Sequence, residues 1–188
     1  MQEFADEGNG FLMTATLKTL FDILLLRAGP EDLPSSTRLM WGFFALLVAL
    51  QSGLGAWLMP EDTSILPQAL LSGLASLGWL ALVLRLFGKP ERFTQTATAM
   101  LGIACLFAPI SLPVIASIRP QMGQTVEWSP LVGLAFAISL FLVYLNGRML
   151  RAAIERPLFQ CIVLFLLGEF LVFAVTLTLG VGAAGPGT

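Results

Sequence analysis

Long apolar stretches alternate with short polar connections along most of this chain. Each stretch has about 20 mostly apolar residues, the length that an α-helix needs to cross about 30 Å of hydrocarbon. The stretches cover residues 37–59, 66–87, 93–117, 130–150 and 157–179. Ser35 precedes the first, and Pro130 and Pro157 open the last two, as is typical of helix N-termini. The pattern predicts an all-α membrane protein, with a five-span transmembrane helix bundle in residues 37–179 and a short external tail at 180–188.

The residues before the first span follow a different pattern. Residues 1–10 are polar and acidic, and we expect a disordered tail there. From 11 to 29, apolar residues recur with helical spacing on one face and polar residues occupy another, which predicts an N-terminal amphipathic interfacial helix. Its characteristic residues are Leu17, Lys18, Phe21 and Leu24. Gly29 is expected to end this helix in the left-handed conformation, directly before Pro30.

Two questions about this region stay open in the sequence. The amphipathic helix fits a strut on the membrane surface that fixes the first span, and it also fits a docking surface for a cytoplasmic partner. Met1 and Met13 are both candidates for the natural start, and with Met13 the preceding residues would be an extension.

The basic residues predict the orientation of the chain in the membrane. Of its ten Lys and Arg residues, nine lie near the entry to the first span or around the connections between spans two and three and spans four and five, and only Arg119 lies on the other side. Positive charge is retained in cytoplasmic loops. We therefore expect a multi-pass membrane protein with its N-terminus in the cytoplasm and its C-terminus outside. The expected contacts with lipid headgroups are Lys89, Arg92, Arg148, Arg151 and Arg156.

The composition agrees with a membrane location. Hydrophobic residues make up 56% of the chain and charged residues only 12%, whereas soluble proteins contain about 25% charged residues. A soluble domain of this length would leave much of its apolar surface in water. We expect membrane lipids as partners, together with a homo-oligomer or a larger membrane complex, and no nucleic acid.

Side chains suited to catalysis are scarce in this sequence. It has no histidine, no glycine-rich phosphate loop and no nucleophile motif, and its connections are short. Cys105 and Cys161 are expected at different depths, which favours packing over a disulfide or a metal site. We therefore expect no catalytic activity, no cofactor and no metal.

Glu169 and two prolines are the candidate functional residues within the spans. Glu169 falls near the middle of the fifth span, where a carboxylate is costly and is by default a functional candidate. Two roles fit it: a protonated residue that holds helices together, or a contact for a proton, a lipid or a partner. Pro109 and Pro113 each remove a helical hydrogen bond, so we expect the third span to be kinked or partly unwound there.

Part of the chain resembles bacterial members of the Ypt-interacting-protein (Yip) family. The similarity lies in the amphipathic lead that ends at residues 27–30, in the five-span layout, and in the stretch from Phe87 to Thr96 that opens the third span. The resemblance implies a five-span membrane domain with a cytoplasmic N-terminus, located in a bacterial inner membrane. Eukaryotic relatives bind small GTPases of the Rab class, but their long N-terminal region has no counterpart here, so the resemblance does not extend to GTPase binding.

Three classes of function compete on these observations. The leading hypothesis is an integral membrane scaffold or an assembly or accessory protein without catalytic activity. The alternative is a small transporter, channel or lipid-handling protein that uses Glu169 and the region of Pro109 and Pro113. A membrane enzyme is the third and the least supported, because no nucleophile, base or metal set is present.

Overall fold

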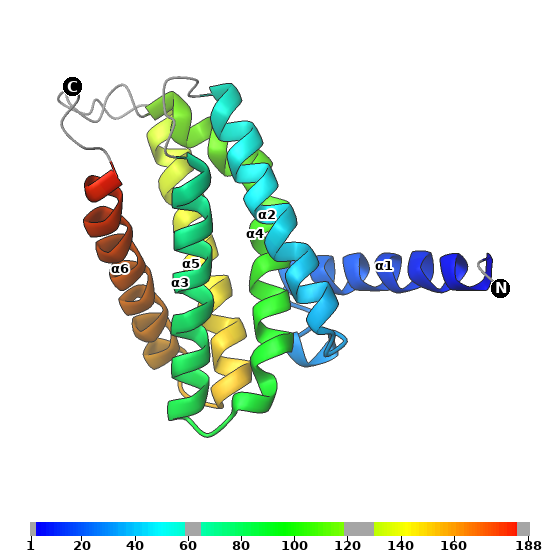
Figure 1. The fold of residues 1–188 in the computed structure, drawn as a ribbon. Coiled ribbons are helices and arrows are strands. Elements are labelled where there is room, and N and C mark those ends of the chain that lie inside the picture. The colour runs from blue at the N-terminus through cyan, green and yellow to red at the C-terminus, as the bar shows by residue number, and fades with distance from the viewer. Residues whose placement is uncertain (1–2, 59–64, 119–129, 184–188) are drawn as a thin grey trace.

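The computed structural model describes the backbone of residues 3–58, 65–118 and 130–183 (Figure 1). The helices in these ranges are α1 (Glu3–Leu24), α2 (Thr37–Leu58), α3 (Ile65–Leu86), α4 (Phe93–Ile118), α5 (Pro130–Ile154) and α6 (Leu158–Ala183), with short 3-10 helices η1 (Pro30–Asp32) and η2 (Pro90–Arg92). By length and composition, α2 to α6 can each cross a membrane. The predicted all-α, five-span fold is therefore confirmed, and each described span end lies within four residues of its expected position.

The fourth helix is the centre of the bundle. In the apolar part of α4, 50% of the residues are buried, against 11% to 28% in the other four spans. It packs against α2 and α5, and α6 lies on the far side against α3 and α5 (Figure 1). The buried core joins side chains of all five spans, and Cys105 and Cys161 lie within it as free thiols. This agrees with the packing role expected for both cysteines.

The first helix projects sideways from the bundle (Figure 1). It is helical from Glu3, where the sequence led us to expect a disordered tail at residues 1–10, and residues 1 and 2 lie outside the described residues. Acidic residue types occupy the first turns of α1, and negative charge stabilises the N-terminal end of a helix. Residues 184–188 of the expected external tail and Arg119 lie outside the described residues.

The first helix also ends earlier than expected, at Leu24, and a residue other than Gly29 takes the left-handed conformation after it. Leu26, with φ of 63°, takes the left-handed position that the sequence assigned to Gly29. The amide of Leu26 donates to the carbonyl of Ile23 (2.9 Å) and that of Arg27 to Asp22 (2.8 Å), which is a Schellman motif. Gly29 is extended instead, because its amide donates to Asp32 Oδ2 (2.9 Å) at the start of η1.

The last turns of α1 have one face on the bundle and one apolar face exposed. Thr16, Leu20 and Ile23 are buried, and Leu20 lies against Gly102 of α4, where a larger residue would collide with it. Leu17 and Phe21 are exposed. Since a free apolar face beside a transmembrane bundle is available to lipid, this arrangement agrees with the predicted interfacial helix.

The central helix is continuous through both of its prolines. The expectation of partial unwinding at Pro109 and Pro113 is wrong, because α4 is helical over its whole length. The φ angle of proline is itself helical, so each ring removes only the bond to the carbonyl four residues earlier. The expected kink stays a prediction.

The approach of α6 to α3 depends on a glycine. The indole Nε1 of Trp79 on α3 donates to the carbonyl of Leu164 on α6 (3.1 Å), and the same ring lies directly over Gly168. A Cβ at Gly168 would overlap the indole ring. In lipid, small residues drive helix association because they let backbones approach closely.

We expect Gly168→Val to destabilise the protein by roughly 1–3 kcal/mol, the usual effect of overpacking a close contact. The valine would displace Trp79 and break its hydrogen bond. Gly133→Val on α5 is the matched control, since a Cβ there meets nothing within 4 Å. Thermal unfolding in detergent, followed by circular dichroism, measures the difference. Equal losses in the two variants would show that valine in the helix, and not the α3–α6 contact, determines the effect.

Candidate functional site

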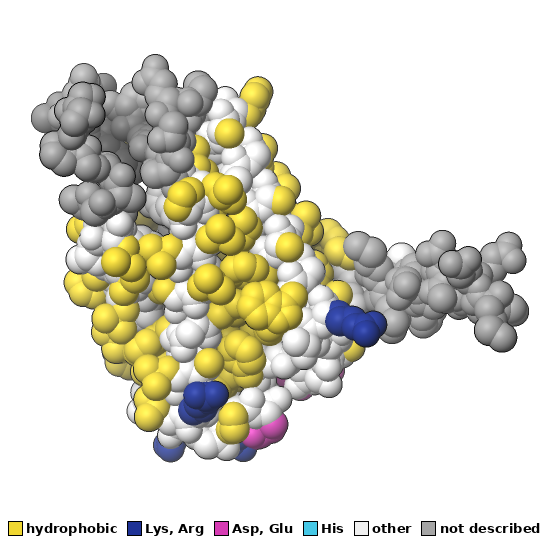
Figure 2. Space-filling model, viewed as in Figure 1, with side chains coloured by type: hydrophobic (Ala, Val, Ile, Leu, Met, Phe, Trp, Pro, Cys, Tyr) yellow, Lys and Arg dark blue, Asp and Glu magenta, His cyan; other side chains and the backbone are white. Residues whose placement is uncertain are grey.

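One end of the bundle, which we call the basic end, carries most of the basic residues. It is formed by the connections from α3 to α4 and from α5 to α6, and its cations are Arg85, Lys89, Arg92, Arg148, Arg151 and Arg156. In Figure 2, dark blue groups lie at this end and at the base of α1, while hydrophobic side chains cover much of the bundle above them.

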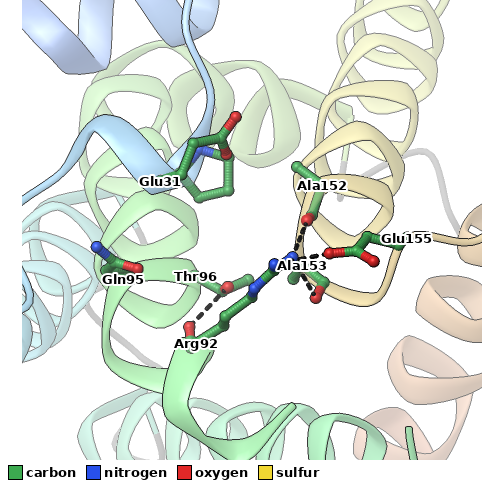
Figure 3. Close-up of a pocket in the computed structure, with 8 residues that line it drawn as sticks. Glu31, Arg92, Gln95, Thr96, Ala152, Ala153 and Glu155 are labelled. Atoms are coloured by element: carbon green, nitrogen blue, oxygen red, sulfur yellow. Dashed lines mark hydrogen bonds and ion pairs between the residues drawn. The ribbon is translucent and has the colours of Figure 1, made fainter. Parts of the chain in front are cut away.

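Arg92 joins the start of α4 to the end of α5. Its Nη1 donates to the carbonyls of Ala152 (2.8 Å) and Ala153 (3.1 Å), and its Nη2 lies 2.6 Å from Glu155 Oε1 (Figure 3). The last carbonyls of a helix have no partner within the helix, and a guanidinium presents several donors in a fixed fork. Arg92 therefore caps α5 from outside and ties its end to α4.

The turns on either side bring these groups together. Gly88, with φ of 70°, ends α3 in a Schellman motif in which the amide of Lys89 donates to the carbonyl of Leu84 (2.8 Å). That turn leads into η2 and places Lys89 Nζ 3.4 Å from Glu155 Oε1. Glu155 itself has φ of 57° directly after α5. The hydrogen bond from Arg92, followed by the charge of Lys89, lowers the pKa of Glu155 below its ordinary value.

These contacts divide the five predicted headgroup cations. Lys89 and Arg92 pair with Glu155, and the guanidinium of Arg156 lies 5.6 Å from the centre of the Phe87 ring. The structure thus gathers the cations at one end, but three of them already have intramolecular partners.

The two remaining cations are differently placed. Within the described part of the chain, neither Arg148 nor Arg151 forms an ion pair. Arg148 makes one long hydrogen bond, from Nη1 to the carbonyl of Leu26 (3.5 Å). These two residues therefore keep more donors for an outside anion.

Two hollows flank η1 at the basic end. The first, of about 320 Å³, lies between η1 and the ends of α4 and α5, with Arg92, Gln95 and Thr96 on one wall and Glu31 on another (Figure 3). The second, of about 280 Å³, lies between the end of α1, η1 and α5. Gln95 holds η1 in place by donating from Nε2 to the carbonyl of Leu33 (3.0 Å).

Sequence reasoning missed Glu31, Gln95 and Arg27, which line or shape these hollows. They lie far apart in the chain from the α5 residues that they face, so no local pattern indicates their proximity. Gln95 lies inside the stretch that carries the family resemblance, which is the one signal that pointed near it.

Glu169 lies on the outside of the bundle. Its side chain is exposed, and no hydrogen bond or ion pair joins it to another described residue. Beside it is a small hollow of about 50 Å³, lined by Ser76, Trp79 and Met100 among others. Met100 lies about two turns from the start of α4, so this hollow is nearer the basic end than the opposite end.

The structure does not bring Glu169 together with the two prolines. Neither Pro109 nor Pro113 lines the hollow beside Glu169. Pro109 follows Met100 by nine residues on α4, a separation of about 14 Å along the helix. Pro109 is also exposed on the surface of α4.

The remaining observations on the site are negative. In residues 3–58, 65–118 and 130–183, no group of three or more His, Cys, Asp or Glu residues could hold a metal ion. Comparison with protein-family models, curated proteins and solved structures finds no match to this chain.

We expect Glu155→Gln to lower the melting temperature at neutral pH, because glutamine cannot form the ion pairs with Arg92 and Lys89. A carboxyl with a lowered folded-state pKa stabilises the protein above its unfolded-state pKa, and this contribution is lost as the pH falls through the folded-state value. The difference between wild type and variant should therefore disappear in acid.

Melting temperatures from neutral to acidic pH measure this difference. Glu91→Gln is the control, since Glu91 is exposed and has no ion pair with another described residue. A Glu155→Gln difference that stays constant across the pH range would contradict the role of the ion pairs.

Proposed function

We propose that this chain is an integral membrane scaffold or an assembly or accessory protein, Yip-like in layout and without catalytic activity, that binds a transmembrane helix of another subunit along α6. The observation that carries the proposal is Glu169, an exposed residue of the apolar helix α6 whose carboxyl has no hydrogen bond or ion pair among the described residues. A carboxyl that faces lipid costs a few kcal/mol on insertion scales. A hydrogen-bond donor on a neighbouring helix removes much of that cost.

The surface around Glu169 suits a helix partner. Leu166, Phe170, Phe173 and Leu177 follow one another at three- and four-residue spacing, so they share one face of α6, and all are exposed. Glu169 lies at the edge of this stripe. Apolar contact along the stripe, with one polar contact beside it, is a common arrangement between transmembrane helices. The partner is either a second copy of this chain or another membrane protein.

A small transporter or lipid-handling protein is the second candidate. The hollow of about 50 Å³ beside Glu169 favours it, because this volume has room for a few water molecules. Such a hollow suits a proton better than a larger solute. The sideways exposure of Glu169 and its distance from Pro109 give more support to the scaffold.

The resemblance to bacterial proteins supports a placement in a bacterial inner membrane, and the charge distribution supports an orientation with the basic end and the N-terminus on the cytoplasmic side. Lys and Arg concentrate at the basic end, and cytoplasmic loops carry an excess of these residues.

For the first proposal, we expect wild-type protein in lipid nanodiscs to contain a second polypeptide in fixed ratio. Glu169→Gln should keep it, because an amide still forms hydrogen bonds. Glu169→Leu should weaken the association roughly three- to tenfold, in line with the modest strength of such bonds between helices. Mass spectrometry of intact particles gives the ratio, with Glu91→Gln as a control outside the spans.

Wild-type particles that contain a single chain under all mild extraction conditions would contradict the scaffold. Loss of proton flux in both Glu169→Gln and Glu169→Leu, with unchanged particle composition, would favour the second candidate.

For the orientation, we expect single cysteines introduced at Lys89 and Arg151 to react with a membrane-impermeant reagent only after the membrane is permeabilised. Cysteines at Glu61 and Thr188 should react in intact cells. The physical reason is that the basic connections stay in the cytoplasm during insertion. The reverse labelling pattern would overturn the orientation.

A further inference from the structure

The hollow of about 280 Å³ beneath the end of α1, which we call the elbow hollow, is lined by charged residues that form no ion pair within the described part of the chain. Its charged lining residues are Arg27, Glu31, Asp32 and Arg148. The geometry points to a binding site for a membrane phospholipid whose headgroup carries a phosphate and a primary amine.

The two arginines provide the phosphate-binding side. Arg148 uses one donor in a long bond to the Leu26 carbonyl (3.5 Å), and its other donors have no bond to the described residues. The side chain of Arg27 is exposed and has no hydrogen bond or ion pair in the described part of the chain. Two arginines that line one hollow suit phosphate, because a guanidinium binds phosphate oxygens with paired donors.

The carboxylates of this hollow differ in what they do. Asp32 accepts the amide hydrogen of Gly29 (2.9 Å), so it is part of the turn. The carboxylate of Glu31 lies over Gly29 and has no hydrogen bond or ion pair among the described residues. Glu31 and both arginines line the same hollow without forming a salt bridge. An ammonium group near Glu31 would neutralise the carboxylate, and a phosphate near the arginines would neutralise their positive charge.

The surface above the hollow favours a lipid over a free solute. Leu134, Phe141, Tyr144 and Arg148 follow one another on α5 at spacings of seven, three and four residues, so they lie on one face. The side chains of Leu134, Phe141 and Tyr144 are exposed. Phe141 packs against Phe107 of α4, with ring centres 6.0 Å apart. A lipid phosphate at Arg148 would place an acyl chain along this stripe.

The neighbouring hollow, of about 320 Å³, is a weaker candidate for the same ligand. Its arginine, Arg92, is already held by Glu155 and by two carbonyls of α5. The elbow hollow is also independent of the surface proposed for assembly, because it lies between α1 and α5, whereas Glu169 lies on α6. Either proposal can fail without the other.

Native mass spectrometry of delipidated protein tests the proposal with three probes: phosphatidylethanolamine, phosphatidylglycerol and inorganic phosphate. We expect wild type to bind added phosphatidylethanolamine in preference to phosphatidylglycerol. Arg148→Gln and Arg27→Gln should each weaken this binding about tenfold, the effect of losing a charge-assisted contact. Glu31→Gln should remove the preference for the amine while phosphatidylglycerol still binds.

Arg85→Gln is the matched control, since it removes a cation at the same end of the bundle but on α3, away from the hollow. The side chain of Arg27 has no hydrogen bond or ion pair with the described fold that its loss could disrupt, so Arg27→Gln separates binding from folding. Equal lipid retention in all variants would overturn the proposal. So would an Arg148-dependent site that holds inorganic phosphate and no lipid.

Discussion

Polar backbone groups at helix ends are the constraint on which this structure depends. In a bilayer, a helix satisfies its own amides and carbonyls except in its first and last turns. This chain closes some of those turns with its own backbone, as in the Schellman motifs after α1 and α3, and others with side chains from elsewhere in the fold. Arg92 in η2 binds the last carbonyls of α5, Arg148 on α5 reaches the end of α1, and Gln95 on α4 holds the segment after η1. Each contact satisfies a carbonyl and at the same time fixes the position of one helix relative to another.

The same contacts determine which charges remain for function. Glu155 forms ion pairs with Arg92 and Lys89, and the guanidinium of Arg156 lies over the Phe87 ring. Among the charged groups that form no ion pair with a described residue are the carboxyl of Glu169 on the outer flank of α6 and the charges around the elbow hollow. We therefore base the two proposals on charged groups that form no ion pair within the described residues.

Close packing of the helices in the bundle depends on glycines at the points of contact. Gly102 admits Leu20 of α1 and Gly168 admits Trp79, so α1 approaches α4 and α6 approaches α3 at single points. Lipid is as apolar as these side chains, so close van der Waals contact and hydrogen bonds such as Trp79 to Leu164 must provide the association energy. Glu169 is exposed next to Gly168, directly beside this contact.

The sequence by itself determined the number, limits and composition of the spans, because hydropathy and helix length are properties of neighbouring residues. It also indicated the basic end, the amphipathic α1 and Glu169 as an unusual residue. Tertiary structure alone decided which groups meet. Leu26 adopts the left-handed conformation expected for Gly29, whose amide instead donates to Asp32. Two of the expected headgroup cations, Lys89 and Arg92, pair with Glu155. Glu31 and Arg148 are separated by more than a hundred residues of sequence, and only the packing of η1 on α5 brings them to one hollow.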